Sequence, residues 1–210
     1  MVFLSIGNKN YKSLLNQIEH YDNIEIRLDL CDLNNAQIAE LFSLEKRFIA
    51  TFRGELSNKI FGCLKLAIES GASFCDIDIR EDETYRQNLK EICELNNCRL
   101  IYSYHNYLET PSSEFMRSII QLMSDQGAEI SKIVCTAYTI DDTLKIMSLY
   151  KDKEHKIIAF SLGDFGKFTR VCAVPMGAAF TYASLDDENK TAPGQINYEK
   201  LSTIMANLID

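Results

Sequence analysis

Short β-rich segments alternate with longer amphipathic segments along all 210 residues, and this alternation limits the fold more than any other feature of the sequence. Each β-rich segment has five or six residues and is rich in Ile, Val, Phe or Tyr, the composition typical of a strand. The segments are Val2–Ile6, Ile24–Leu28, Phe48–Phe52, Phe74–Ile79, Arg99–Ser103, Ile130–Cys135, Ile157–Ser161 and Ala178–Ala183.

The segments between these strands carry apolar residues three and four positions apart, which is the period of a half-buried helix. Pro111 with the Ser-Ser-Glu that follows it predicts one helix start, and Thr139 with Asp142 predicts a capping box at another. Gly71 and Gly127 follow two of the segments, where helices commonly end. The clearest helical segments are Asn35–Ser43, Asn58–Ser70, Phe115–Ser124, Asp141–Tyr150 and Tyr198–Leu208.

Strands that alternate with helices predict a parallel sheet of the α/β class, because each helix is a crossover connection. A closed (β/α)8 barrel and an open doubly wound sheet both have this pattern. Eight βα units in 210 residues leave no room for a second domain, so the count favours a single (β/α)8 TIM barrel over residues 1–210. Such barrels typically have about 250 residues, so a trimmed barrel is expected.

Charge and composition exclude several other classes of protein. The 22 basic and 30 acidic residues give a net charge of -8 and no basic stripe for a nucleic acid backbone. No apolar run is long enough to predict a membrane span, and the N-terminal segment resembles a strand and not a signal peptide. The seven cysteines show no zinc-ligand spacing, which predicts reduced thiols in a cytoplasmic protein without a metal site.

The second strand carries three charges in alternation, and a barrel should keep its functional residues at the carboxyl ends of such strands. Glu25, Arg27 and Asp29 share one face of an extended chain. On a surface strand this face would only be solvated. In a parallel barrel the helices cover the outer face, so we expect the charges to point inward, where buried charges must be paired or used. Glu25 and Arg27 can pair and suit a polar substrate.

Three further strands carry candidate residues. Arg53 ends the third strand, and His105 lies at the tip of the fifth, where a functional role competes with a structural one. Lys132 lies in the apolar sixth strand. A lysine there must either extend to solvent or lose its proton, because desolvation disfavours the ammonium form. The neutral amine can attack a carbonyl carbon, although lysines at strand edges are common without such a role.

The loops after the last two strands are also candidates. The segment SLGDFGKFTR is neither a P-loop nor a kinase signature, because the spacing and the accompanying motifs are absent. It carries Arg170, whose guanidinium suits a carboxylate. The polar loop 186–195 contains a Pro-Gly pair and can act as a lid.

Taken in order, these residues resemble one family, the type I 3-dehydroquinate dehydratases, also called type I dehydroquinases. Each motif alone is weak, but the ordered series covers nearly the whole chain. The motifs are EIRLD at 25–29, TFR at 51–53, IYSYHNYLETP at 101–111, GAEISKI at 127–133, SLGDFGKFTR at 161–170, GAAFTYAS at 177–184 and TAPGQI at 191–196.

The resemblance implies a (β/α)8 barrel that usually forms a homodimer. Such enzymes eliminate water from the small molecule 3-dehydroquinate to give 3-dehydroshikimate, in the shikimate pathway to chorismate and the aromatic amino acids, with no metal or organic cofactor. Family members often begin with a hairpin that closes the barrel bottom. Here Met1 stands almost at the first strand, so we expect a barrel trimmed at its N-terminus.

The resemblance also implies roles for particular residues. Lys132 matches the lysine that forms a Schiff base with the C3 ketone. His105 matches the general base that takes the C2 proton and later protonates the departing C1 hydroxyl. The matches expected to bind the substrate are Arg170 at its carboxylate, Glu25, Arg27 and Arg53 at its ring hydroxyls, and Thr191 and Gln195 in the lid.

The sequence departs from the family pattern in three places. Ser57 stands where the family usually has a glutamate that orients the histidine, and Phe160 stands where it often has methionine. Thr191 takes the place of a lid serine and keeps the hydroxyl. The absent glutamate supports one alternative, a non-catalytic barrel that binds a shikimate-pathway acid. A class I aldolase is a second alternative, but such enzymes usually bind phosphate and lack this lid. The retained Lys132, His105 and Arg170 favour the dehydratase.

Overall fold

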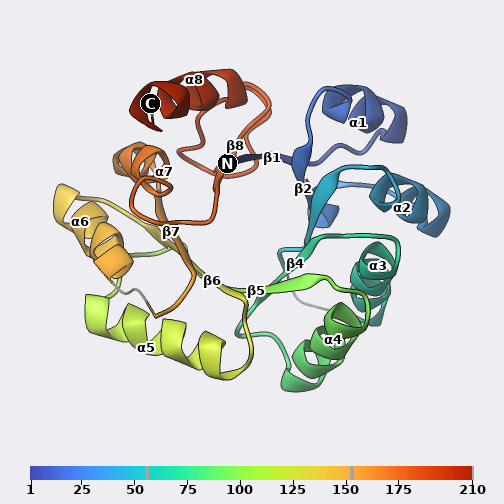
Figure 1. The fold of residues 1–210 in the computed structure, drawn as a ribbon, viewed down its shortest axis with the longest axis horizontal. Helices are drawn as coiled ribbons and strands as arrows, with labels where there is room; N and C mark the ends of the chain where they lie inside the picture. The colour runs from blue at the N-terminus through green and yellow to red at the C-terminus, as the bar shows by residue number, and fades with distance from the viewer. Residues whose placement is uncertain (55–56, 152–153, 210) are drawn as a thin grey trace. The chain divides into compact units, whose positions relative to one another are not determined.

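The strands of this computed structural model lie in one sheet, shown in Figure 1 for residues 1–54, 57–151 and 154–209, the part of the chain that the structure describes. Within this part, the strand order is β7-β6-β5-β4-β3-β2-β1-β8, and the recorded pairings are parallel. The strands are β1 Val2–Ile6, β2 Asn23–Arg27, β3 Arg47–Thr51, β4 Phe74–Asp78, β5 Arg99–Asn106, β6 Ile130–Thr136, β7 Ile157–Leu162 and β8 Thr181–Ala183.

Helices follow the strands in regular alternation, so the chain has the predicted (β/α)8 TIM-barrel fold. The α-helices are α1 Tyr11–Ile18, α2 Asn35–Phe42, α3 Asn58–Glu69, α4 Glu83–Leu95, α5 Ser113–Asp125, α6 Ile140–Ser148, α7 Lys167–Cys172 and α8 Tyr198–Ile209. Three 3-10 turns accompany them: η1 Leu28–Leu30, η2 Leu149–Lys151 and η3 Asp164–Gly166.

Two strands, β5 and β8, differ in length from the sequence prediction by more than one residue. β5 continues past Ser103 to Asn106, so that His105 is part of the strand. β8 begins at Thr181 and not at Ala178, because the Ala178 amide still donates to the Ala173 carbonyl at 2.9 Å in the turn that ends α7. The composition of residues 178–180 favours a strand, but the turn that follows α7 includes Ala178.

Residues 4–101 form one compact unit, in which β2 to β4 pair in register and α2, α3 and α4 lie side by side (Figure 1). Helix α3 buries Leu64, Ala67 and Ile68, the three- and four-residue spacing of a half-buried helix. Gly71 ends this helix at φ +117°, and a Cβ there would lie 2.8 Å from the Phe42 carbonyl oxygen. The position therefore requires glycine.

Residues 1–3 and 102–210 form the second compact unit, described by itself. Strands β6 and β7 pair from Ser131 and Ile157 to Thr136 and Leu162, and nearly every residue of both strands is buried. Strands buried on both faces are expected where helices cover a parallel sheet. An apolar cluster packs α8 against the strands: Leu201 and Met205 of α8 lie with Ala183 of β8 and Val2 of β1.

The predicted helix signals are present. The side chain of Ser112 caps α5 by accepting from the Phe115 amide at 3.2 Å. Thr139 and Asp142 form the predicted capping box of α6. Gly127 has φ +94°, the left-handed conformation of a helix end. Across the described residues we find no helix with the length and apolarity that a bilayer span requires.

We predict that Asp142→Ala lowers the free energy of unfolding by about 1 kcal/mol at pH 7, because it removes half of the capping box. Partial burial raises the pKa of Asp142, but hydrogen bonds from Lys145, Thr139 and Tyr138 outweigh it and lower the pKa below its usual value. A lowered pKa stabilises the fold above the unfolded value, so the difference from wild type should shrink as the pH falls below about 4.

Urea unfolding at pH 7 and pH 3 measures this effect, with Asp141→Ala as the matched control. Asp141 carries a charge in the same first turn of α6. We expect the control to cost less than about 0.5 kcal/mol at both pH values, as for an ordinary surface substitution. Equal costs for the two variants would contradict the capping role of Asp142.

Candidate active site

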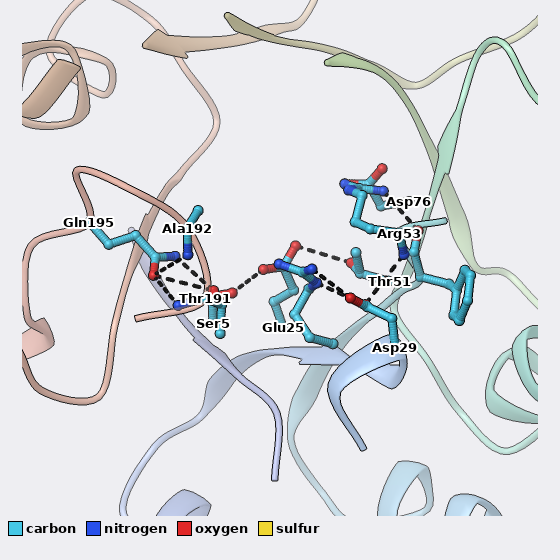
Figure 2. Close-up of polar contacts among 11 residues, drawn as sticks. Ser5, Glu25, Asp29, Thr51, Arg53, Asp76, Thr191, Ala192 and Gln195 are labelled. Carbon is cyan, nitrogen blue, oxygen red and sulfur yellow. Dashed lines mark hydrogen bonds and ion pairs between the residues drawn. The ribbon is translucent and has the colours of Figure 1, made fainter. Parts of the chain in front are cut away.

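Glu25 lies buried on β2 and is held from both neighbouring strands (Figure 2). The hydroxyl of Ser5 on β1 donates to Glu25 Oε2, and the hydroxyl of Thr51 on β3 donates to Oε1 at 3.1 Å. The two hydroxyls occupy one oxygen each, so the carboxylate plane is fixed. A fixed buried carboxylate can accept a further hydrogen bond from a polar ligand.

Arg27 follows on the same strand and makes a bidentate ion pair with Asp29. Its Nε donates to Asp29 Oδ1 at 2.9 Å and its Nη2 to Oδ2 at 2.6 Å. Burial lowers the pKa of Arg27, but the hydrogen bond to Asp29 and the charge of Glu25 outweigh it, so the net shift is upward. The prediction that Asp29 shares a strand face with Arg27 is wrong, because β2 ends at Arg27 and the chain turns into η1.

Arg53 is fixed by a carboxylate that the sequence analysis missed. Its Nη2 donates to Asp76 Oδ2 at 2.6 Å, and its backbone amide donates to Asp29 Oδ1 at 3.3 Å. The Asp76 side chain is 0% exposed. Burial lowers the pKa of Arg53, but the charge of Asp76 and its hydrogen bond outweigh this effect. The pKa of Arg53 is therefore raised, and the side chain stays a cation. The sequence signal that could have pointed to Asp76 is a charged residue inside the apolar run of β4.

Lys132 is 4% exposed on β6, so its side chain stays in the core and does not extend to solvent. Its Nζ lies 4.1 Å from the centroid of the Tyr182 ring on β8. The negative face of an aromatic ring attracts a cation at this distance. The structure therefore gives the buried amine an aromatic neighbour on a strand near the end of the chain.

His105 is buried near the end of β5, with the Tyr107 ring nearly parallel to its own at a centroid distance of 6.0 Å and 20° between planes. Ser57, at the position of the family glutamate, caps α3 by accepting from the Ile60 amide at 3.5 Å. Its hydroxyl is therefore used in starting a helix. Glu55, which precedes Ser57 by two positions in the sequence, lies outside the described residues.

Arg170 lies in α7, and its side chain is among the most buried in the chain. The guanidinium carbon is 4.3 Å from the centroid of the Phe160 ring on β7, and Nη2 donates to the Pro193 carbonyl at 3.4 Å. Helix α7 starts against β7 because Gly166 has no side chain: a Cβ there would lie 2.1 Å from the Ser161 carbonyl oxygen. This close approach of helix and strand fixes the position of the Arg170 backbone in α7.

The loop after β8 is folded around Gln195, which is 4% exposed (Figure 2). Gln195 Oε1 accepts from the Thr191 amide at 2.7 Å and from the Ala192 amide at 3.2 Å, and Nε2 donates to Thr191 Oγ1 at 3.0 Å. Gly194, at φ +78°, lets the loop approach the Gly163 carbonyl, which a Cβ would meet at 2.5 Å. Thr191 and Gln195 thus support each other.

Metal ligation has no visible basis in the part of the chain that the structure describes. No three His, Cys, Asp or Glu side chains there are arranged to hold a metal ion. The functional groups that are present are ammonium, imidazole, guanidinium, carboxylate and amide. Guanidinium and carboxylate groups can bind a polyhydroxylated acid, and an imidazole can transfer protons.

Comparison with known proteins identifies the family. The sequence profile of the type I 3-dehydroquinases matches residues 2–209. The chain belongs to this family. A 3-dehydroquinate dehydratase from Dehalococcoides mccartyi is 32% identical over 189 residues, covering 86% of this chain and 83% of that protein. Type I 3-dehydroquinases are hydro-lyases, so the chain is an enzyme, and membership decides against the class I aldolase.

Solved structures of the family share the fold. The type I 3-dehydroquinate dehydratase of Clostridium difficile, described with covalently modified comenic acid, has a TM-score of 0.87 at 21% identity over 99% of this chain and 91% of its own. The enzyme of Aquifex aeolicus has a TM-score of 0.86 at 23% identity over 100% of this chain and 99% of its own. The predicted resemblance and the predicted barrel are both confirmed.

We predict that Asp76→Ala lowers the free energy of unfolding by about 3–5 kcal/mol, because it leaves the Arg53 cation buried without its carboxylate. Asp78→Ala on the same strand is the control. Asp78 pairs with Arg80, whose side chain is 57% exposed, and such pairs contribute about 0–1 kcal/mol. Urea unfolding of both variants measures the difference, and equal costs would contradict the buried pair as the main stabiliser of Arg53.

Proposed function

We propose that this enzyme dehydrates 3-dehydroquinate to 3-dehydroshikimate, a step of the shikimate pathway, through an imine on Lys132. The observation that carries the proposal is the buried Lys132 amine on β6, in a chain that belongs to a family of hydro-lyases. The relative from Dehalococcoides mccartyi is named for this activity, and the match covers 83% of that protein.

The first step is attack of the neutral Lys132 amine on the C3 ketone carbon. A C–N bond forms, the ketone oxygen leaves as water after taking two protons, and a protonated imine results. This cation acidifies the neighbouring C2–H bond because it can accept the electron pair. No metal or organic cofactor is needed for that electron sink.

His105 then moves two protons. It takes the C2 proton, and the C–H electrons enter the imine to give an enamine. The protonated imidazole next gives a proton to the C1 hydroxyl, which leaves as water while the enamine electrons form the C1–C2 double bond. Water hydrolyses the restored imine and releases the product with Lys132 regenerated. One imidazole suits both transfers because its neutral form accepts a proton and its protonated form donates one.

The remaining polar residues bind the substrate in this proposal. Arg170 pairs with the substrate carboxylate, for which a guanidinium is well shaped. Thr191 and Gln195 lie in the lid loop, whose Pro193 carbonyl accepts from Arg170. Ring hydroxyls are bound by Glu25, which Ser5 and Thr51 hold in place, and by Arg27 and Arg53, which Asp29 and Asp76 hold in place. The predictions of a homodimer and of a cytoplasmic location stay predictions.

An ultraviolet assay for the conjugated enone-acid product tests the proposal. We expect turnover by the wild type and a loss of at least about 10²-fold in kcat for Lys132→Ala and for His105→Ala. Lys156→Ala removes an exposed lysine that pairs with Glu129 and should keep wild-type rates. No turnover by the wild type would favour the non-catalytic barrel, and wild-type rates for Lys132→Ala would exclude the imine.

We predict that Arg170→Ala raises KM about 10- to 100-fold, because a charge-assisted hydrogen bond contributes about 1.5–3 kcal/mol. Arg170→Lys should recover part of the loss, since it keeps the cation but not the bidentate geometry. Steady-state kinetics measures both, with circular dichroism melting to confirm folding. An unchanged KM in folded Arg170→Ala would contradict its role as the carboxylate anchor.

A further inference from the structure

Two cations of residues 102–210 are each covered by the face of an aromatic ring. Lys132 Nζ lies 4.1 Å from the Tyr182 ring centroid, and the Arg170 guanidinium carbon lies 4.3 Å from the Phe160 ring centroid. All four side chains are buried, between 1% and 4% exposed. A cation–ring contact is strongest when water is excluded, so both contacts have the surroundings in which they matter most.

The two rings also touch each other. Phe160 and Tyr182 meet edge to face, with centroids 5.9 Å apart and 62° between their planes. Tyr182 is supported in turn by Phe180 at 5.6 Å and 73°, again edge to face. Edge-to-face pairs have a preferred geometry beyond their apolar contact. Lys132, Tyr182, Phe160 and Arg170 therefore form one continuous packed row, which we call the aromatic row.

The aromatic row fits the needs of the proposed reaction. Lys132 nitrogen is positively charged both as the ammonium and as the protonated imine, so one ring face attracts it before and after the substrate is attached.

We propose that Tyr182 and Phe160 are positioning residues: Tyr182 holds the Lys132 nitrogen, Phe160 holds the Arg170 guanidinium, and their contact fixes the spacing between the two. The inference rests on the proposed function, in which Lys132 binds C3 of the substrate and Arg170 its carboxylate. Both points belong to one small ring, so the distance between the two cations must match the substrate. A rigid pair of rings sets that distance better than flexible aliphatic side chains.

Steady-state kinetics of ring and aliphatic variants tests this inference. Tyr182→Phe keeps the ring face and should keep kcat within about 3-fold. Tyr182→Leu should lower kcat about 10-fold with little change in KM, since it removes the partner of the reacting nitrogen. Phe160→Leu should raise KM about 5- to 10-fold and keep kcat. The double variant should lose less than the product of the single losses, because the rings act through their contact.

Phe42→Leu is the control for loss of a buried aromatic ring. Phe42 packs against the Phe48 ring at 5.2 Å in residues 4–101, and it should lower the melting temperature without changing kcat or KM. A Tyr182→Leu rate equal to that of Tyr182→Phe, or the same kinetic change in Tyr182→Leu and Phe160→Leu, would overturn the inference while leaving the proposed function intact. Absence of turnover by the wild type would overturn both.

Discussion

Burial of charge on the strands is the constraint on which the rest of the structure depends. Helices cover the strands of a parallel sheet, so a charged side chain on such a strand leaves water at a cost of several kcal/mol unless it is compensated. Glu25, Asp76 and Lys132 are all buried on strands of this chain. Each has neighbours that compensate its charge, and the choice of neighbour decides what the group can do.

In residues 4–101 the compensation comes from hydroxyls and opposite charges. Ser5 and Thr51 donate to Glu25, and Asp76 pairs with Arg53 at 2.6 Å. These contacts fix the side chains in one position. That suits groups that only bind and orient a polar ligand.

In residues 102–210 the compensation for the two buried cations includes ring faces. Tyr182 covers Lys132, and Phe160 covers Arg170. Each ring face attracts the cation that lies over it and helps to hold it in one position. In the proposed function, these two cations bind C3 and the carboxylate of the substrate.

Much of the fold could be predicted from the sequence because its signals are local. Strand composition, the capping box at Thr139 and the glycine at Gly71 each depend on a few adjacent residues. Lys132 could be singled out because it is a lone charge in an apolar strand. Its partner Tyr182 could not, because the two residues are fifty positions apart and only the folded chain brings the ring of β8 to the amine of β6.

The same limit explains the errors among carboxylates. Asp29 was assigned to the strand by its two-residue spacing, although the chain turns into η1 directly after Arg27. The role of Asp76 is not visible in the sequence, because its ion-pair partner Arg53 lies twenty-three residues away. For Asp29 the two-residue pattern extends past the end of the strand, and for Asp76 the partner Arg53 lies on another segment whose register the sequence does not state.

Reductive trapping tests the central claim, that Lys132 is the reacting amine, most directly. The protein is incubated with 3-dehydroquinate, reduced with borohydride, digested and analysed by mass spectrometry. Reduction converts the imine to a stable secondary amine, so the predicted result is a mass increase on the peptide that contains Lys132 and on no other lysine peptide. An unmodified Lys132 under conditions that label a control type I dehydratase would contradict the claim.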